Sequence, residues 1–385
     1  MMLSDLSKDL ADKFTLENSR YVLRENMVCH TYDFVSDISF QFDDEKELFK
    51  INLDGSNLDN GEKENQNFRY AVFTPNKNKK YSEAIILLHG LNERNWGKYL
   101  PWAYHLVLQT QKPVILFPIA YHMNRSPLTW ICPRLMNKFS ISRKEAAPAI
   151  ENSSFVNVAL SLRMDHCPEL FSMSGIQTYF DIVKLTSAMK AGHFEIFEND
   201  CHIDFFAYSI GALLTETLLI SNPLQLFTGS KAFFFCGGST FDKINGCSRS
   251  IMDSQAFAHL KNHVLNHTDV LEKEIKIPEQ NAHLLKDGWK AFLAMSGINN
   301  YINHRENSFK HLINRIKAIG LEGDFVVPGN AIKDTLGKVF FDVDVLDFPF
   351  KYSHEAPFPV HNQKINDAVT QSFNLVFNKA SLFLS

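Results

Sequence analysis

The chain has 385 residues, of which 45% are hydrophobic, so it can form one large domain or two ordinary ones. Its formal net charge of −4 lacks the basic excess of a dedicated nucleic-acid-binding protein, so we expect no nucleic-acid partner. No segment approaches the roughly 18 consecutive apolar residues of a membrane span. The first 16 residues lack the apolar run of a secretory signal, and we therefore expect a cytoplasmic protein.

Sequence motifs for cofactors and metals are absent. The six cysteines are scattered and form no CxxC pair, which favours reduced structural thiols over a zinc site. The chain has no GxxxxGK[ST], GxGxxG or HExxH motif. We therefore expect neither a metal nor an organic cofactor, and the sequence leaves the oligomeric state open.

Residues 1–80 are predicted to form a helix followed by strands. Partial alternation of apolar and polar residues predicts strands at Tyr21–Leu23, Ile38–Phe42 and Phe68–Phe73. The polar run Asp54–Gln66 between them predicts a loop. We expect this part to be a strand-rich N-terminal extension of a larger sheet.

From Ala84 onward, continuous apolar runs alternate with helix-like segments. Such runs are typical of strands buried on both faces, so the alternation predicts a mostly parallel α/β sheet with helices on both faces. The expected strands are Ala84–Leu88, Pro113–Pro118, Ile203–Ala207, Lys231–Cys236, Ile316–Leu321 and Val339–Val345. The expected helices are Leu100–Thr110, Gly175–Lys190, Gly211–Ile220 and a closing helix that carries Ile365, Val369, Phe373, Val376 and Ala380 on one face.

Two segments, 124–174 and 239–305, are too long for simple connections between a strand and a helix. The second contains the helix-like stretches Ser254–His267 and Asn281–Met295, and we interpret it as a helical cap over the carboxyl edge of the sheet. The core domain is then expected to comprise residues 81–238 and 306–385, with 124–174 as an insertion.

Three arginines of the first insertion, Arg125, Arg134 and Arg163, are candidates for contact with an acidic substrate. Solvated surface arginines are the more common case, and that is what we expect here.

The sequence Ala207-Tyr208-Ser209-Ile210-Gly211 carries the main chemical signal. A buried strand leads into it and a helix follows it. A serine between them would protrude on a sharp, strained turn, and small residues two positions before and after it would let strand and helix pack closely. Ser209 is therefore the candidate nucleophile; the alternative is a serine that caps a core helix.

A second motif, His89-Gly90-Leu91-Asn92, follows the strand Ala84–Leu88. With the serine motif it resembles the α/β-hydrolase superfamily, over roughly residues 80–125, 175–240 and 306–385. The resemblance implies that the backbone N–H groups of Ile210 and Leu91, with Asn92 as second choice to Leu91, form an oxyanion hole.

The same resemblance suggests the other two members of a catalytic triad. Asp324 lies in Gly320–Pro328, after a late strand, where the family has its orienting acid. His354 precedes the closing helix, where the family has its general base. The rival acids are Asp334, Asp342, Asp344 and Asp347, and the rival base is His361.

We therefore expect an α/β-hydrolase fold with a helical cap and a serine hydrolase that cleaves an ester-like bond of a small substrate. The same triad acting on an amide, thioester or C–C bond is one alternative. A non-catalytic ligand-binding protein with this fold is another. Apolar cap residues at helical spacing suggest a partly apolar substrate: Phe257, Leu260, Trp289, Phe292 and Leu293.

Overall fold

The computed structural model describes residues 1–40, 52–53, 56–57, 61–77, 79–266, 275–276, 281–337 and 341–385. Parts of four expected segments lie outside these ranges: residues 41–42 and 339–340 of two strands, residues 54–55 and 58–60 of the polar run, and His267 at the end of a helix.

The N-terminal part contributes one helix and several strands. Its elements are α1 (Leu3–Lys13), β1 (Arg20–Arg24), β2 (Met27–Val35), β3 (Ser39–Phe40), β4 (Asn52–Leu53), β5 (Ser56–Asn57), α2 (Glu62–Gln66) and β6 (Asn67–Pro75). The strand β2 had no clear sequence signal, and α2 lies where the sequence predicted a loop.

The rest of the chain alternates strands with helices. The elements up to residue 235 are β7 (Tyr81–Leu88), α3 (Leu100–Thr110), β8 (Val114–Leu116), η2 (Met123–Arg125), η3 (Leu128–Ile131), α4 (Pro133–Ala146), α5 (Val158–His166), α6 (Glu169–Lys190), β9 (Phe197–Tyr208), α7 (Ile210–Ser221), η4 (Pro223–Gln225) and β10 (Ala232–Phe235). They are followed by η5 (Phe241–Lys243), α8 (Ser254–Asn266), β11 (Ile275–Lys276), α10 (Ala282–Ser296), η7 (Asn299–Tyr301), α11 (Ile302–Lys310), β12 (Ile316–Leu321), α12 (Gly329–Leu336), β13 (Asp342–Leu346), η9 (Gln363–Ile365) and α13 (Asn366–Leu384).

The main sheet has nine strands in the order β1-β2-β6-β8-β7-β9-β10-β12-β13. The pairs β1–β2, β2–β6 and β6–β8 are antiparallel, and the five remaining pairs are parallel. The N-terminal strands thus extend one edge of a mostly parallel sheet.

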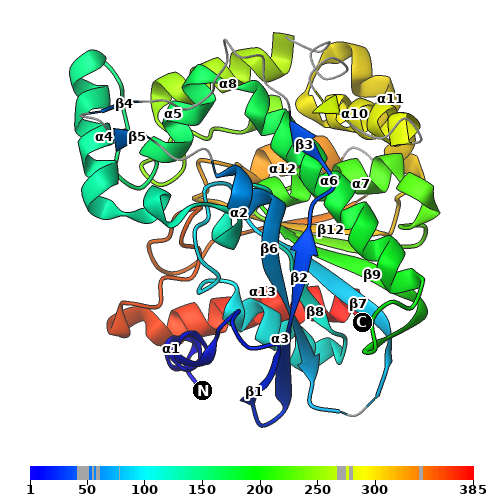
Figure 1. Cartoon of the computed structure of the whole chain (residues 1–385). Helices are drawn as coiled ribbons and strands as arrows, with labels where there is room; N and C mark the ends of the chain where they lie inside the picture. The colour runs from blue at the N-terminus through cyan, green and yellow to red at the C-terminus, as the bar shows by residue number, and fades with distance from the viewer. Residues whose placement is uncertain are drawn as a thin grey trace.

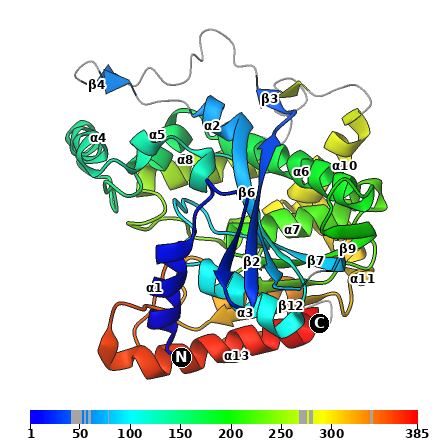
Figure 2. The ribbon, with the colours of Figure 1, turned by 60° about the horizontal axis from the view of Figure 1, so that its bottom comes forward.

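Neighbouring residues of the central strands serve two separate cores, because successive side chains of a strand point to opposite faces. Ile85 and Leu87 pack with α1, α3 and α13, whereas Ile86 and Leu88 pack with the layer that includes α6 and α7. In Figures 1 and 2, α13 runs along one side of the sheet, and α6 and α7 lie on the other. Helices cover both faces, and the predicted α/β class is confirmed.

The segment 239–305 contributes α8, α10 and α11, and α10 packs along α7. These helices lie beyond α6 and α7, on the side of the molecule away from α13 (Figure 1). The helices expected in this segment are therefore present. None of the helices in the described ranges has the length and apolarity needed to cross a membrane.

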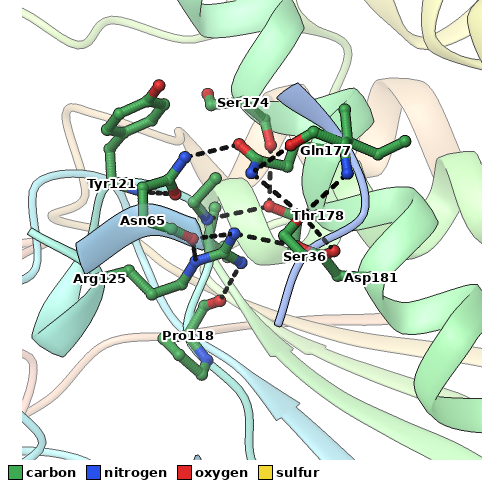
Figure 3. Close-up of polar contacts among 12 residues, drawn as sticks. Ser36, Asn65, Pro118, Tyr121, Arg125, Ser174, Gln177, Thr178 and Asp181 are labelled. Atoms are coloured by element: carbon green, nitrogen blue, oxygen red, sulfur yellow. Dashed lines mark hydrogen bonds and ion pairs between the residues drawn. The ribbon is translucent and has the colours of Figure 1, made fainter. Parts of the chain in front are cut away.

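The prediction for two arginines of the first insertion was wrong. Arg125 and Arg163 are only 0% and 3% exposed, whereas Arg134 is exposed as expected. Arg125 Nη2 forms an ion pair with Asp181 Oδ2 on α6 at 2.9 Å, and its guanidinium also donates to the carbonyls of Asn65 and Pro118 (Figure 3). The burial of Arg125 depends on an acid 56 positions away, which local sequence patterns do not reveal.

The expected loop over residues 54–66 was also wrong at its end, because Glu62–Gln66 form α2. Asn65 of this helix is buried and belongs to the same polar network (Figure 3). Its Nδ2 donates to Gln177 Oε1 at 2.7 Å, and its Oδ1 accepts from the N–H of Tyr121 at 3.0 Å. These bonds to distant residues fix a polar segment that has no apolar pattern of its own.

Candidate active site

Ser209 lies at the sharp turn between β9 and α7. Its φ of 55° and ψ of −121° belong to a region that residues other than glycine rarely adopt, and such strain is typical of functional sites. The turn also requires Gly211, because a Cβ there would lie 2.8 Å from the carbonyl oxygen of Leu88 and 2.9 Å from that of His89. The close approach of α7 to the end of β7 therefore depends on glycine.

The structure brings Ser209 together with His354 and Asp324. His354 Nε2 lies 2.7 Å from Ser209 Oγ, and His354 Nδ1 lies 2.7 Å from Asp324 Oδ2. The three residues are 7%, 4% and 2% exposed, respectively. A continuous chain of hydrogen bonds thus joins the hydroxyl, the imidazole and the carboxylate in a site largely closed to water.

Asp324 is held in place by the turn that carries it. Its Oδ1 accepts hydrogen bonds from the backbone N–H groups of Val326 and Val327, both at 2.9 Å. Its Oδ2 is thereby directed to His354. The thiol of Cys236 lies nearby, and burial, together with the charge of Asp324, raises the pKa of this thiol well above its usual value. The carboxylate therefore faces no second negative charge from Cys236.

The rival residues are engaged elsewhere. Asp334 forms an ion pair with a lysine at 3.3 Å, and Asp342 and Asp344 form ion pairs with lysines at 2.5 and 2.6 Å. Asp347 accepts a hydrogen bond from Tyr352 at 3.0 Å, and His361 is exposed.

Tyr208, which the sequence analysis did not select, contacts both the backbone and the imidazole of His354. Its hydroxyl donates to the backbone carbonyl of His354, and its ring stacks on the imidazole with centroids 5.3 Å apart and an angle of 21°. Lys98 supports the next residue, because its ammonium group donates to the carbonyl of Glu355 at 3.2 Å. Apart from the position of Tyr208 next to the serine, no sequence pattern indicated either role.

The loop after β7 is connected to the same support. Lys98 forms an ion pair with Glu93, and Glu93 Oε1 also accepts from the hydroxyl of Tyr99 at 2.9 Å. The hydroxyl of Tyr99 accepts in turn from the backbone N–H of Gly90 at 3.0 Å. One polar cluster therefore fixes both the His354 loop and the loop that starts with His89-Gly90.

His89 has a structural environment rather than a catalytic one. It is fully buried, its Nε2 accepts from the N–H of Ile119 at 2.9 Å, and its Nδ1 lies 2.8 Å from the carbonyl oxygen of Gly90. Burial lowers its pKa to about 3. A neutral His89 that donates through Nδ1 therefore ties the loop after β7 to the loop after β8.

Two residues, Leu91 and Ile210, are expected to supply the oxyanion donors. Both line one cavity of the structure. Asn92, the second choice, has φ of 61°, and its side-chain amide donates to the carbonyls of Val156 and Ser250 at 3.2 and 2.6 Å. The Asn92 side chain therefore fastens this loop to the first insertion and to the cap segment.

The cavity has a volume of about 60 Å³. The apolar part of its wall includes Leu91, Ile119, Phe171, Ile176, Leu213 and Phe292. Two hydroxyls in the wall, those of Ser174 and Thr217, donate to carbonyls of their own helices at 2.9 Å. Burial lowers the pKa of His122, which also lines the cavity, well below its usual value. The His122 imidazole is therefore uncharged at neutral pH.

Of the cap residues expected near the substrate, Phe292 lies in the cavity wall. The others pack in or against the hydrophobic core: Phe257, Leu260, Trp289 and Leu293. Within the described ranges, no three His, Cys, Asp or Glu side chains come together as a metal site requires.

Comparison with solved structures finds distant esterases. The chain is similar to a carboxyl esterase 2 from the mycorrhizal fungus Tuber melanosporum, with 8% identity, a TM-score of 0.46, and coverage of 99% of this chain and 98% of that one. It is also similar to an esterase of Pyrobaculum calidifontis (10% identity, TM-score 0.42, coverage 98% and 90%). A third is a cold-adapted esterase from an Arctic intertidal metagenomic library (8% identity, TM-score 0.41, coverage 97% and 100%). Likenesses this distant carry no information on activity.

The sequence comparisons are more limited. No curated protein matches the chain by sequence. A model described as a family of unknown function, DUF6051, matches residues 23–385. The chain therefore belongs to the DUF6051 family.

Proposed function

We propose that this protein is a serine hydrolase that cleaves an ester-like bond of a small, partly apolar substrate through an acyl-enzyme on Ser209. The observation that carries the proposal is the chain of 2.7 Å hydrogen bonds from Ser209 through His354 to Asp324, combined with the strained backbone at Ser209. A serine that merely capped α7 would need neither feature. The side chain of Ser209 also makes no capping hydrogen bond to α7.

In the proposed reaction, Ser209 Oγ attacks the substrate carbonyl carbon while His354 Nε2 takes the hydroxyl proton. Asp324 keeps the proton of His354 on Nδ1 and stabilises the imidazolium that forms. The backbone N–H groups of Leu91 and Ile210 are the proposed donors to the negative oxygen of the tetrahedral intermediate.

His354 then gives its proton to the leaving alcohol as the bond to that alcohol breaks, which leaves an acyl group on Ser209. Water attacks this ester with His354 as base and releases the acid. Both steps use only groups of this chain and water, so the proposed reaction has no step that needs a metal or organic cofactor.

The proposed substrate is small because the cavity beside the site holds only about 60 Å³. It is partly apolar because carbon atoms and internally bonded hydroxyls form most of the described wall. The domain division expected from the sequence is part of the proposal: a core of 81–238 and 306–385 carries the triad, and the cap 239–305 contributes Phe292 to the wall.

Two other functions are separated from this one by experiment. Cleavage of an amide, thioester or C–C bond would use the same triad and is distinguished by a panel of substrates. A ligand-binding protein without turnover would keep the fold but would not react with an activated phosphonate.

The test is covalent labelling with a fluorophosphonate and hydrolysis of short nitrophenyl esters, for the wild type and Ser209→Ala. We expect labelling of the wild type only, and a loss of turnover by several orders of magnitude in the variant, because triad members act as a unit. Ser153→Ala is a matched control, since Ser153 is also buried but lies in the first insertion. Equal labelling of wild type and Ser209→Ala would refute the proposal.

A further inference from the structure

Gly175 lies in the interior of the long helix α6, where glycine is unfavourable relative to alanine. Its φ is not among the positive values found in the described chain, so the backbone does not require a glycine here. Gly175 also lines the cavity beside Leu91 and Ile210.

Packing does not require a glycine either. A Cβ built on Gly175 meets no described atom within 4 Å outside its own stretch of helix, so it would enter open space. Gly288 in α10 shows the opposite case, because a Cβ there would lie 3.0 Å from the ring of Tyr179. Gly175 is half-buried and lines the cavity, so a side chain here would enter open space at the edge of the cavity.

We propose that this cavity binds the acyl part of the substrate, that this part is a short unbranched apolar chain, and that Gly175 sets the length of chain that fits. The inference rests on the proposed function, because it takes Leu91 and Ile210 as the donors to the substrate carbonyl oxygen. Both donors line the cavity, so the carbonyl carbon lies beside it. The leaving alcohol must face His354, which protonates it, and the acyl chain is then the group directed into the cavity.

The size of the cavity gives the length of the chain. A water-sized group needs about 10–15 Å³ by this measure, so the volume has room for roughly four to six non-hydrogen atoms. Butanoyl to hexanoyl groups, which have four to six carbons with the carbonyl carbon included, meet this limit. The uncharged wall excludes a charged end of the chain, because no ionised group of the described wall would compensate it.

The test measures kcat/KM for nitrophenyl esters from acetyl to decanoyl, for the wild type, Gly175→Ala and Gly175→Leu. In the wild type we expect kcat/KM to rise by about fourfold per methylene up to butanoyl–hexanoyl and to fall for longer chains. Leucine fills most of the space, so Gly175→Leu should lower the hexanoyl-to-acetyl ratio at least tenfold, and Gly175→Ala should lower it less.

Gly337→Leu is the matched control, because Gly337 lies at the end of α12 and a Cβ there also meets no described atom within 4 Å. It should leave the ratio unchanged. Melting temperature and fluorophosphonate labelling show whether each variant is folded with a reactive serine.

An unchanged chain-length profile in a folded, labelled Gly175→Leu protein would overturn the pocket assignment while leaving the hydrolase proposal intact. A wild type that is neither labelled nor active on any ester would defeat the hydrolase proposal, and the pocket assignment would fail with it.

Discussion

Replacing Asp324 with asparagine tests the proposed triad without changing its shape. In the structure, Asp324 Oδ1 accepts from two backbone N–H groups, those of Val326 and Val327. An asparagine at this position must direct its side-chain oxygen to these two donors, since its NH₂ group cannot accept from them. The NH₂ group then points at His354 Nδ1.

The consequence is a change of tautomer. An NH₂ group donates to Nδ1, so the proton of His354 moves to Nε2, and this nitrogen can no longer accept the proton of Ser209. A wrong tautomer of this kind lowers kcat by about 10⁴, which corresponds to about 5.5 kcal/mol in the barrier. We expect Asp324→Asn to lose between 10³- and 10⁴-fold in kcat on a short nitrophenyl ester.

The assay compares kcat and the rate of fluorophosphonate labelling for Asp324→Asn, Asp342→Asn and Asp344→Asn. The last two residues form ion pairs on β13, and their replacement should change kcat less than threefold. A folded Asp324→Asn enzyme with kcat within tenfold of the wild type would show that Asp324 does not orient the base.

Two further predictions concern the supports of the site. Tyr208→Phe removes the hydroxyl that donates to the His354 carbonyl but keeps the stacked ring, so kcat should fall up to about tenfold with little change in KM. The control Tyr81→Phe loses a hydrogen bond to a carbonyl far from the site and should not alter kcat. An equal loss of kcat in both variants would exclude a positioning role for Tyr208. The pKa of His89 is about 3 in the folded protein, below its ordinary value, so only the unfolded chain takes up this proton as the pH falls below 6.5. The free energy of unfolding should therefore decrease by about 1.4 kcal/mol per pH unit between pH 6 and 4 on account of His89. Urea unfolding should show a slope smaller by this amount in His89→Gln, and identical slopes would contradict the assignment.

The sequence by itself determined the parallel half of the sheet and its helices. Buried parallel strands need continuous apolar runs, and segments such as Ala84–Leu88 and Ile316–Leu321 have them. The helix Leu100–Thr110 was predicted with its observed bounds. The sequence also identified Ser209 as a candidate, because the strand–serine–helix pattern with Gly211 is local. It identified Asp324 and His354 through a resemblance in chain order.

Tertiary structure alone decided the features that depend on distant partners. Arg125 was expected at the surface and is buried, because Asp181 on another element compensates its charge. Glu62–Gln66 form a helix because Asn65 bonds residues that lie more than 50 positions away.

The supports of the site follow the same rule. Tyr208 and Lys98 hold the His354 loop across more than 140 positions of sequence. Gly175 of α6 lines a cavity to which α7 and α10 also contribute side chains. The periodicity of a sequence segment indicates the face of the helix or strand on which a side chain lies. The partner of that side chain depends on which elements the fold brings together.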